Sequence, residues 1–258
     1  MPALPQELVD HIIDDVGAQD KRAVANLTLT CNSWTPRSSK HLFHVVNIFT
    51  SHLAEFLAHA ATSSRLTSHA SELSISQPLH GDDAFDLTPF IPVIFHTLPN
   101  LRKLSIFGDR ISIKSGSLPV PSAHRRSLAL LRLSGTYVEA FPDFLRLFGQ
   151  IGTLQLDYIH DTSPFTDSIY GRHLHVANLF FDGSRSTLEA LTPLLDKSSL
   201  RSLHLKCDRF FRIHTPAINK LLHDVGQSLE CFRFDLPMDG WVVQGPGMFG
   251  STCTSLSH

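Results

Sequence analysis

Beyond residue 65 the hydrophobic positions repeat in a fixed order of an apolar residue, two variable residues, a second apolar residue, one variable residue and a third apolar residue. Seven copies of this pattern are Ala70/Leu73/Ile75, Leu101/Leu104/Ile106, Leu128/Leu131/Leu133, Ile151/Leu154/Leu156, Val176/Leu179/Phe181, Leu200/Leu203/Leu205 and Leu229/Phe232/Phe234. Residues two apart lie on the same face of a β-strand, so each copy predicts a short strand with one buried face. The middle residues of successive copies are 23 to 31 positions apart, which indicates an irregular repeat.

Segments with helical spacing lie between several of these strands. The apolar stripes are Phe141/Phe144/Leu145/Phe148, Leu188/Leu191/Leu195 and Ile218/Leu221/Leu222/Val225. Thr215 followed by Pro216 predicts that the last of these helices begins there, because proline suits the first helical position. Residues 79–98 predict a further helix that is broken or bent at Pro89 and Pro92. Short strands that alternate with helices predict an α/β fold with a parallel sheet and helices along the outside.

The first 44 residues follow a different pattern, one of short amphipathic helices. Pro5 suits the start of a first helix, and Leu8, Ile12 and Val16 follow it at i, i+4 and i+8, with Val9 and Ile13 widening the stripe. Gly17 is expected to end this helix, and Asp20 to cap the next by accepting a backbone hydrogen bond.

The second helix of this segment is amphipathic as well. Its apolar stripe is formed by Val24, Leu27, Cys31 and Trp34. Pro36 cannot continue a helix interior, so a third short helix with Leu42 and Phe43 is expected to begin there. Three such helices form a thin core, and a unit of that size usually needs a neighbour.

Charge and composition exclude several classes of protein. The chain of 258 residues carries a formal net charge of −2 and 42% hydrophobic residues. Neither the first 50 residues nor the remainder has a basic excess, so the electrostatic footprint of a nucleic-acid-binding protein is missing. The first residues show no charged region followed by an apolar run, as a secretory leader would, and no apolar run is as long as a membrane span. We therefore expect a protein that is intracellular, in the cytoplasm, the nucleus or both, with no nucleic-acid or membrane partner.

The four cysteines do not predict a metal site. Cys31, Cys207, Cys231 and Cys253 form no CxxC pair, so reduced, buried thiols are the favoured interpretation. His173 with His175, and His41 with His44, could each share a face, but neither pair has an acidic or cysteine partner at a spacing typical of metal ligands. The glycine-rich segment 240–250 lacks the Gly-Lys-Ser/Thr ending of a phosphate-binding loop. The sequence thus predicts no catalytic residues, no metal and no cofactor; a hydrolase or metal enzyme would need a site that it does not show.

The N-terminal segment resembles an F-box. In F-box proteins a Leu-Pro pair opens the motif, a Pro-x-Glu-Leu/Ile-x-x-x-Ile helix follows, and Cys-x-x-Trp closes the second helix. Here these elements are Leu4-Pro5, Pro5 to Ile12, and Cys31 to Trp34. The resemblance implies that a set of residues divides between the core of the module and a surface that docks the Skp-family adaptor of a cullin-RING ubiquitin ligase. These residues are Leu4, Pro5, Leu8, Ile12, Leu27, Cys31 and Trp34.

Two departures from the F-box pattern bear on this interpretation. Gly17 lies near a position where the family often has a second leucine, and Asn26 and Thr28 place polar groups in the second helix. We expect weaker adaptor binding than is usual in the family. A generic three-helix cap on a repeat domain remains the alternative.

The repeated strand pattern resembles degenerate leucine-rich repeats, whose period is about 20 to 29 residues. The resemblance implies an irregular solenoid with parallel strands on its concave side and helices outside, in a chain that is truncated or covered by a partner at its end, where Ser255 to His258 could open another strand. A solenoid binds along its concave sheet, and strand alternation identifies candidate target-binding side chains on that face. They are Lys103, Arg132, Gln155, Phe180, His204 and Arg233. An ordinary solvated sheet remains the alternative.

Together these patterns predict a non-enzymatic protein in three parts. Residues 1–50 are expected to form the F-box-like helical module, residues 51–69 a linking helix, and residues 70–258 the degenerate leucine-rich-repeat domain. The expected function is substrate recognition in a Skp–cullin–F-box ubiquitin ligase: the helices dock the Skp-family adaptor, and the repeats bind a protein target whose identity the sequence does not give. The alternative is a non-catalytic leucine-rich-repeat scaffold without ligase coupling.

Overall fold

The computed structural model describes residues 5–78, 84–114, 125–139, 141–161, 173–206, 211–235 and 254–255. The fold is α/β with mostly parallel strands, as the alternation of strands and helices predicts. The chain forms two compact units, one of residues 1–78 and 90–104, the other of residues 79–89 and 105–258. We call them unit 1 and unit 2.

Unit 1 begins with three helices that pack against one another: α1 (Gln6–Gln19), α2 (Lys21–Thr30) and α3 (Thr35–His44). The Asp20 side chain accepts hydrogen bonds from the backbone N–H groups of Arg22 and Ala23, at 2.8 and 3.3 Å, so the predicted cap of α2 is confirmed. Pro36 lies in the first turn of α3, where the sequence places it.

Helix α1 differs from the prediction at Gly17, which does not end it. The helix continues for two more residues, and a Cβ on Gly17 would lie 2.5 Å from the ring of His41. The glycine therefore allows a close approach between α1 and α3. Of the predicted broad stripe only Val9 and Ile13 are buried, together with Val24 of α2.

The rest of unit 1 holds an edge strand that the sequence pattern did not reveal. Strand β1 (Val45–Phe49) follows α3 directly and pairs in parallel with β2 (Glu72–Ser76) over its full length. The segment predicted as one linking helix contains two, and the remaining elements are a short 3₁₀ helix (Thr50–His52), α4 (Leu53–Thr62), α5 (Ser64–His69) and α6 (Phe90–Thr97). The strand order is β1-β2-β4, where β4 (Lys103–Phe107) begins in unit 1 and ends in unit 2.

Unit 2 contains the longer strands. From β4 onward the strand order is β4-β6-β8-β10-β11-β12-β13. The strands that follow β4 are β6 (Arg126–Ser134), β8 (Phe148–Asp157), β10 (His175–Asp182), β11 (Ser202–Lys206), β12 (Cys231–Asp235) and β13 (Thr254–Ser255). Strand β13 pairs antiparallel with β12, so these two residues do not continue the parallel array. A second parallel sheet is formed by β3 (Phe85–Asp86), β5 (Ile111–Ile113), β7 (Tyr137–Val138) and β9 (His160–Asp161).

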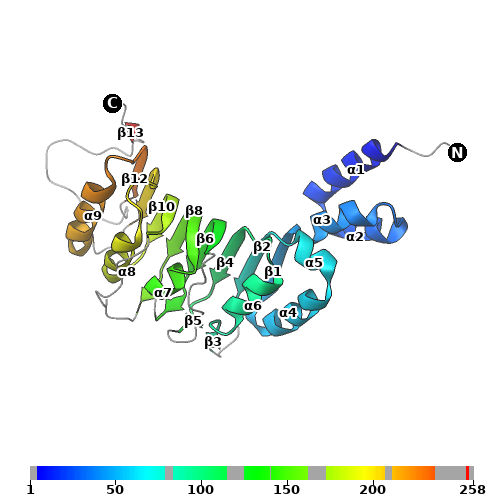
Figure 1. The fold of residues 1–258 in the computed structure, drawn as a ribbon, viewed down its shortest axis with the longest axis horizontal. Coiled ribbons are helices and arrows are strands. Elements are labelled where there is room, and N and C mark those ends of the chain that lie inside the picture. The colour runs from blue at the N-terminus through cyan, green and yellow to red at the C-terminus, as the bar shows by residue number, and fades with distance from the viewer. Residues whose placement is uncertain are drawn as a thin grey trace, which may run out of the picture. The chain divides into compact units, whose positions relative to one another are not determined.

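Helices cover one side of the unit 2 strands. They are α7 (Phe141–Leu145), α8 (Arg185–Leu191), which leads into a 3₁₀ turn (Thr192–Leu194), and α9 (Phe211–Val225) (Figure 1). The predicted stripe of α7 is buried, but Phe148 belongs to β8. Helix α9 begins at Phe211, five residues before Pro216, so proline lies inside the helix and the predicted start is wrong.

The repeated apolar pattern marks the core strands correctly. In the first six copies all three apolar positions are buried. In the seventh, Leu229, Phe232 and Phe234 are only half-buried. The outer neighbour of β12 is the short antiparallel strand β13.

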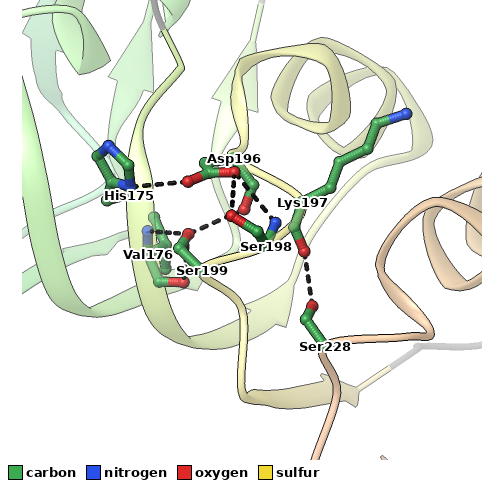
Figure 2. A network of polar contacts seen from close by, with 7 residues as sticks. All are labelled: His175, Val176, Asp196, Lys197, Ser198, Ser199 and Ser228. Carbon is green, nitrogen blue, oxygen red and sulfur yellow. Dashed lines mark hydrogen bonds and ion pairs between the residues drawn. The ribbon is translucent and has the colours of Figure 1, made fainter.

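A polar network ties consecutive repeats together at the amino-terminal ends of the strands (Figure 2). Asp196 accepts a hydrogen bond from Ser198 Oγ at 2.8 Å and forms an ion pair with His175 at 2.8 Å. Burial raises the pKa of Asp196, but the hydrogen bonds from the backbone and side chain of Ser198 outweigh it, and the pKa falls below its usual value. Ser199 bonds the backbone of Val176, and Ser228 Oγ donates to the carbonyl of Lys197 at 2.6 Å. The network therefore fixes the register between β10 and the segments that precede the next two strands.

Candidate functional site

Helix α1 exposes two large apolar side chains of the F-box-like motif. Leu8 is 51% exposed and Ile12 50% exposed. They are four residues apart, so they lie next to each other on one face of the helix. The neighbouring positions Val9 and Ile13 turn to the other side and form the core of the helical module. The paired exposed side chains are an apolar surface that this module does not bury itself.

The other residues that the motif singled out also differ in their exposure to solvent. Leu27 and Trp34 are half-buried, while Pro5 and Cys31 are exposed; Leu4 lies outside the described residues. Leu29, which the motif did not single out, is 86% exposed on α2. Burial thus separates the set into a partly buried pair and an exposed group.

The expectation of buried thiols is wrong for Cys31 and Cys231, which are both exposed and free. Cys31 terminates α2, where its side chain lies 3.1 Å from the hydroxyl of Ser33. This hydrogen bond lowers the pKa of the Cys31 thiol. Cys207 and Cys253 lie outside the described residues, as does the glycine-rich segment 240–250.

An ion-pair cluster holds α1 on α3. The Asp14 carboxylate pairs with the guanidinium of Arg37 through two hydrogen bonds and accepts a third from His41 Nε2 at 2.7 Å. Hydrogen bonding to Arg37, and then to His41, holds the pKa of Asp14 far below its usual range. Since α1 carries Leu8 and Ile12, this cluster orients the exposed apolar surface relative to α3.

In unit 2, five of the six candidate target-binding residues form a row across the sheet. Strand pairing matches Arg132 with Gln155, Gln155 with Phe180, Phe180 with His204, and His204 with Arg233. Their buried neighbours along each strand face the core, so the predicted alternation is confirmed. We call Arg132, Gln155, Phe180, His204 and Arg233 the central row.

A second row lies two residues further along the same strands, near their carboxyl ends. This end row consists of Ser134, Asp157, Asp182, Lys206 and Asp235. Its carboxylates pair with the basic side chains of both rows: Asp157 with Arg132 at 3.2 Å, Asp182 with Lys206 at 2.9 Å, and Asp235 with His204 at 2.7 Å and Arg233 at 3.0 Å. Arg233 and then His204 lower the pKa of Asp235, and Asp182 raises the pKa of Lys206. The three Arg and Lys side chains of these rows are therefore balanced by three carboxylates.

Lys103, the sixth candidate, lies in unit 1 and belongs to a separate cluster. Its Nζ is 2.7 Å from the Glu72 carboxylate, which also approaches His44 Nε2 at 3.5 Å. The structure thus places Lys103 outside the row formed by the other five.

Tyr158 is a further candidate that the sequence interpretation missed. It directly follows β8, has a φ of 52° and is 52% exposed. The second, third and fourth copies of the repeat end their strands with Phe107-Gly108, Ser134-Gly135 and Asp157-Tyr158. Aligning these copies would have shown a tyrosine where the two preceding copies have glycine.

The two histidine pairs differ: His41 and His44 have different acidic partners, whereas the charges of His175 and His173 both lower the pKa of Asp196. His41 contacts Asp14, His44 contacts Glu72 and Ser71, and His175 contacts Asp196. Each has an acidic neighbour from a distant part of the sequence, which the local spacing could not reveal. Within the described ranges there is no group of three or more His, Cys, Asp or Glu side chains arranged to hold a metal ion.

Helices in the described part of the chain are all too short or too polar to cross a membrane. Comparison with known proteins adds no relative: neither the protein-family models nor the curated proteins include a match to this chain.

Proposed function

We propose that the protein is the substrate-recognition subunit of a Skp–cullin–F-box ubiquitin ligase. The observation that carries this proposal is the exposure of Leu8 and Ile12 on one face of α1, within the segment that resembles an F-box. Exposed apolar pairs of this kind are costly in water and typical of binding surfaces. The helical module docks the Skp-family adaptor through this face.

The second part of the proposal concerns the repeats, which we interpret as a degenerate leucine-rich-repeat solenoid. Strand, short second-sheet strand and helix follow one another in that order around β2-β3-α6 and β6-β7-α7, and the strands are parallel with registered rows of side chains. The face that carries the central row and the end row binds the target. The protein performs no chemistry itself: holding a target near the charged ubiquitin enzyme raises the effective concentration of its lysines.

Adaptor binding tests the first part directly. The full chain is co-expressed with a Skp-family adaptor, and the complex is quantified by affinity capture and titration. Leu8→Asp with Ile12→Asp should weaken binding at least tenfold, since a charge in a desolvated apolar contact is costly. The unfolding free energy of the variant should differ from that of the parent by less than about 0.5 kcal/mol, because both side chains are exposed.

The chain offers a matched control on another helix of unit 1. Val93 is an exposed apolar residue of α6, and Val93→Asp introduces one of the two charges of the double variant without altering the helical module. This variant should bind the adaptor as the parent does. A parent chain that folds but fails to bind any Skp-family adaptor, or equal weakening by Val93→Asp, would overturn the proposal.

A repeat scaffold without ligase coupling is the second candidate. It is favoured by the direct passage from α3 into β1 and by the contacts of α3 with α5, because a cap would be joined to the first strand in this way. In that case Leu8→Asp and Ile12→Asp would leave every interaction unchanged. Deleting residues 1–50 is a poorer test, since it also removes β1 from the edge of β2.

A further inference from the structure

The turn after the strands in unit 2 repeats one backbone contact. The N–H of Gly108 donates to the carbonyl of Ser134 at 3.0 Å, that of Gly135 to Asp157 at 2.9 Å, and that of Tyr158 to Asp182 at 2.6 Å. In each case the residue after a strand bonds the last residue of the next strand. The same structural position is therefore occupied by glycine twice and by tyrosine once.

This position needs a backbone that glycine adopts freely and tyrosine does not. The φ angles are 152° at Gly108, 70° at Gly135 and 52° at Tyr158. Tyr158 is the one non-glycine residue with positive φ in the described ranges. Bulky side chains are strained there, and such strain is concentrated at functional sites. Glycine suits this turn better, so the turn itself does not require the tyrosine side chain.

The Tyr158 side chain does not add to the core. It is 52% exposed, and its ring lies 5.7 Å from Lys206 Nζ. Lys206 is in turn held by the carboxylate of Asp182, whose side chain is only 7% exposed. The buried Asp182 thus holds Lys206 by an ion pair, and Lys206 holds the ring of Tyr158 by a cation–π contact at the carboxyl end of the sheet.

A second exposed aromatic side chain belongs to the same surface. Phe180 is in the middle of the central row, 36% exposed, with the ring of His204 5.4 Å away in an edge-to-face arrangement. It precedes Asp182 by two residues on β10 and therefore points to the same face of the sheet. Aromatic side chains held in place are the residue type that most often anchors a protein partner.

The charges of this surface argue for an uncharged ligand. Within the central and end rows, Arg132, Lys206 and Arg233 each have a carboxylate within 3.2 Å. A phosphorylated or acidic segment would have to displace these carboxylates before it gained a charge-assisted hydrogen bond. An apolar side chain can be buried against the aromatic rings without that cost.

We propose that Tyr158 and Phe180 form the anchor site of the target-binding face, and that its ligand is an unphosphorylated protein segment with an aliphatic or aromatic anchor side chain. This inference rests on the proposed role of the repeats in target recognition. Tyr158 acts by direct contact with the anchor, and Lys206 with Asp182 acts by positioning the tyrosine ring.

Selection from two peptide libraries tests whether Tyr158 and Phe180 form an anchor site. The full chain, in a mixture that also contains a Skp-family adaptor, is used to select from a library of short unmodified peptides and from a matched library of phosphoserine peptides. Peptides with an apolar anchor should be enriched, and their affinity measured by fluorescence polarisation should fall at least tenfold in Tyr158→Gly and in Phe180→Ser. Tyr158→Phe, which keeps the ring, should bind within about twofold of the parent.

The glycine variant separates binding from folding. Tyr158→Gly installs the residue found at the two equivalent turns, so its melting temperature should equal or exceed that of the parent. Tyr137→Ser changes an exposed tyrosine of the second sheet and should leave peptide binding intact. Unchanged affinity in Tyr158→Gly, enrichment confined to phosphopeptides, or the absence of selected peptides would each overturn the inference.

Adaptor binding is measured in the same samples. Adaptor binding without peptide selection refutes the anchor site and leaves the ligase proposal standing. Selected peptides that depend on Tyr158 in a chain that binds no adaptor support the anchor site and refute the ligase proposal.

Discussion

Gly17 lies in the last turn of α1, where the backbone of this helix passes close to the ring of His41. A methyl group added at residue 17 would collide with His41 Cγ and Nδ1 at 2.5 and 2.6 Å. The ring cannot move away freely, because its Nε2 is bound to Asp14. From the sequence alone this glycine predicts a helix end. The reason that a side chain is excluded is the contact with α3, which the sequence of α1 does not show.

Gly17→Ala should therefore destabilise the protein, although alanine is the better helix former by about 1 kcal/mol. We expect a loss of about 1 to 3 kcal/mol in unfolding free energy, typical of overpacking, measured by urea denaturation. The exposed neighbour Ala18 provides the reverse control, as Ala18→Gly should cost about 1 kcal/mol by helix propensity alone. A gain in stability for Gly17→Ala would show that the two helices separate easily.

Asp14 predicts a dependence of stability on pH. Hydrogen bonds from Arg37 and His41 hold its folded-state pKa below that of the unfolded chain. Its ion pairs therefore contribute fully above about pH 5, well above the unfolded-state pKa of aspartate, and the contribution is lost as the pH falls towards the folded-state pKa. Asp14 is partly exposed, so we expect only about 1 kcal/mol.

The comparison of Asp14→Asn with the parent measures this contribution. The difference in unfolding free energy should be constant from neutral pH to about pH 5 and shrink below about pH 4. Glu55, an exposed residue of α4 with only a distant contact to His52, serves as the control position for Glu55→Gln. A difference that grows on acidification would contradict the assigned direction of the pKa change.

At the scale of elements, the sequence predicted the core strands because each carries three buried apolar side chains at a fixed spacing. The second sheet was missed, since strands of two or three residues such as Phe85–Asp86 and Tyr137–Val138 show no periodicity. β1 was missed for another reason: it follows α3 without a break, and its side chains are half-buried or exposed. The central row was predictable from strand alternation, whereas its ion pairs depend on register between strands.

Helix α9 offers a test of one element boundary. Pro216 is exposed at the sixth position of Phe211–Val225, where it lacks the N–H that would bond the preceding turn. Pro216→Ala should raise the unfolding free energy by about 1 to 3 kcal/mol, because proline in a helix interior is about 3 kcal/mol less favourable than alanine. Asn219→Ala, at an exposed position of the same helix, should change it by less than about 0.7 kcal/mol. No gain from Pro216→Ala would indicate that the helix begins at the proline, as its sequence suggests.

For the whole molecule, the proposals place adaptor docking on α1 in unit 1 and the target anchor after β8 in unit 2. The two sets of residues belong to different compact units, and independent sites are expected to act additively. Leu8→Asp should therefore leave peptide affinity unchanged, and Tyr158→Gly should leave adaptor affinity unchanged. The double variant should show the sum of the two losses within about 0.5 kcal/mol.

Ubiquitin transfer should respond differently, since it requires both contacts at once. In a reconstituted ligase with a selected peptide fused to a lysine-bearing carrier, either Leu8→Asp or Tyr158→Gly alone should reduce ubiquitin transfer to the level of the untethered carrier. Linking two binding events raises the effective concentration of the carrier only while both are intact. Val93→Asp and Tyr137→Ser should transfer ubiquitin as the parent does. Transfer that survives the loss of adaptor binding would mean that the helices do not couple this chain to a ligase.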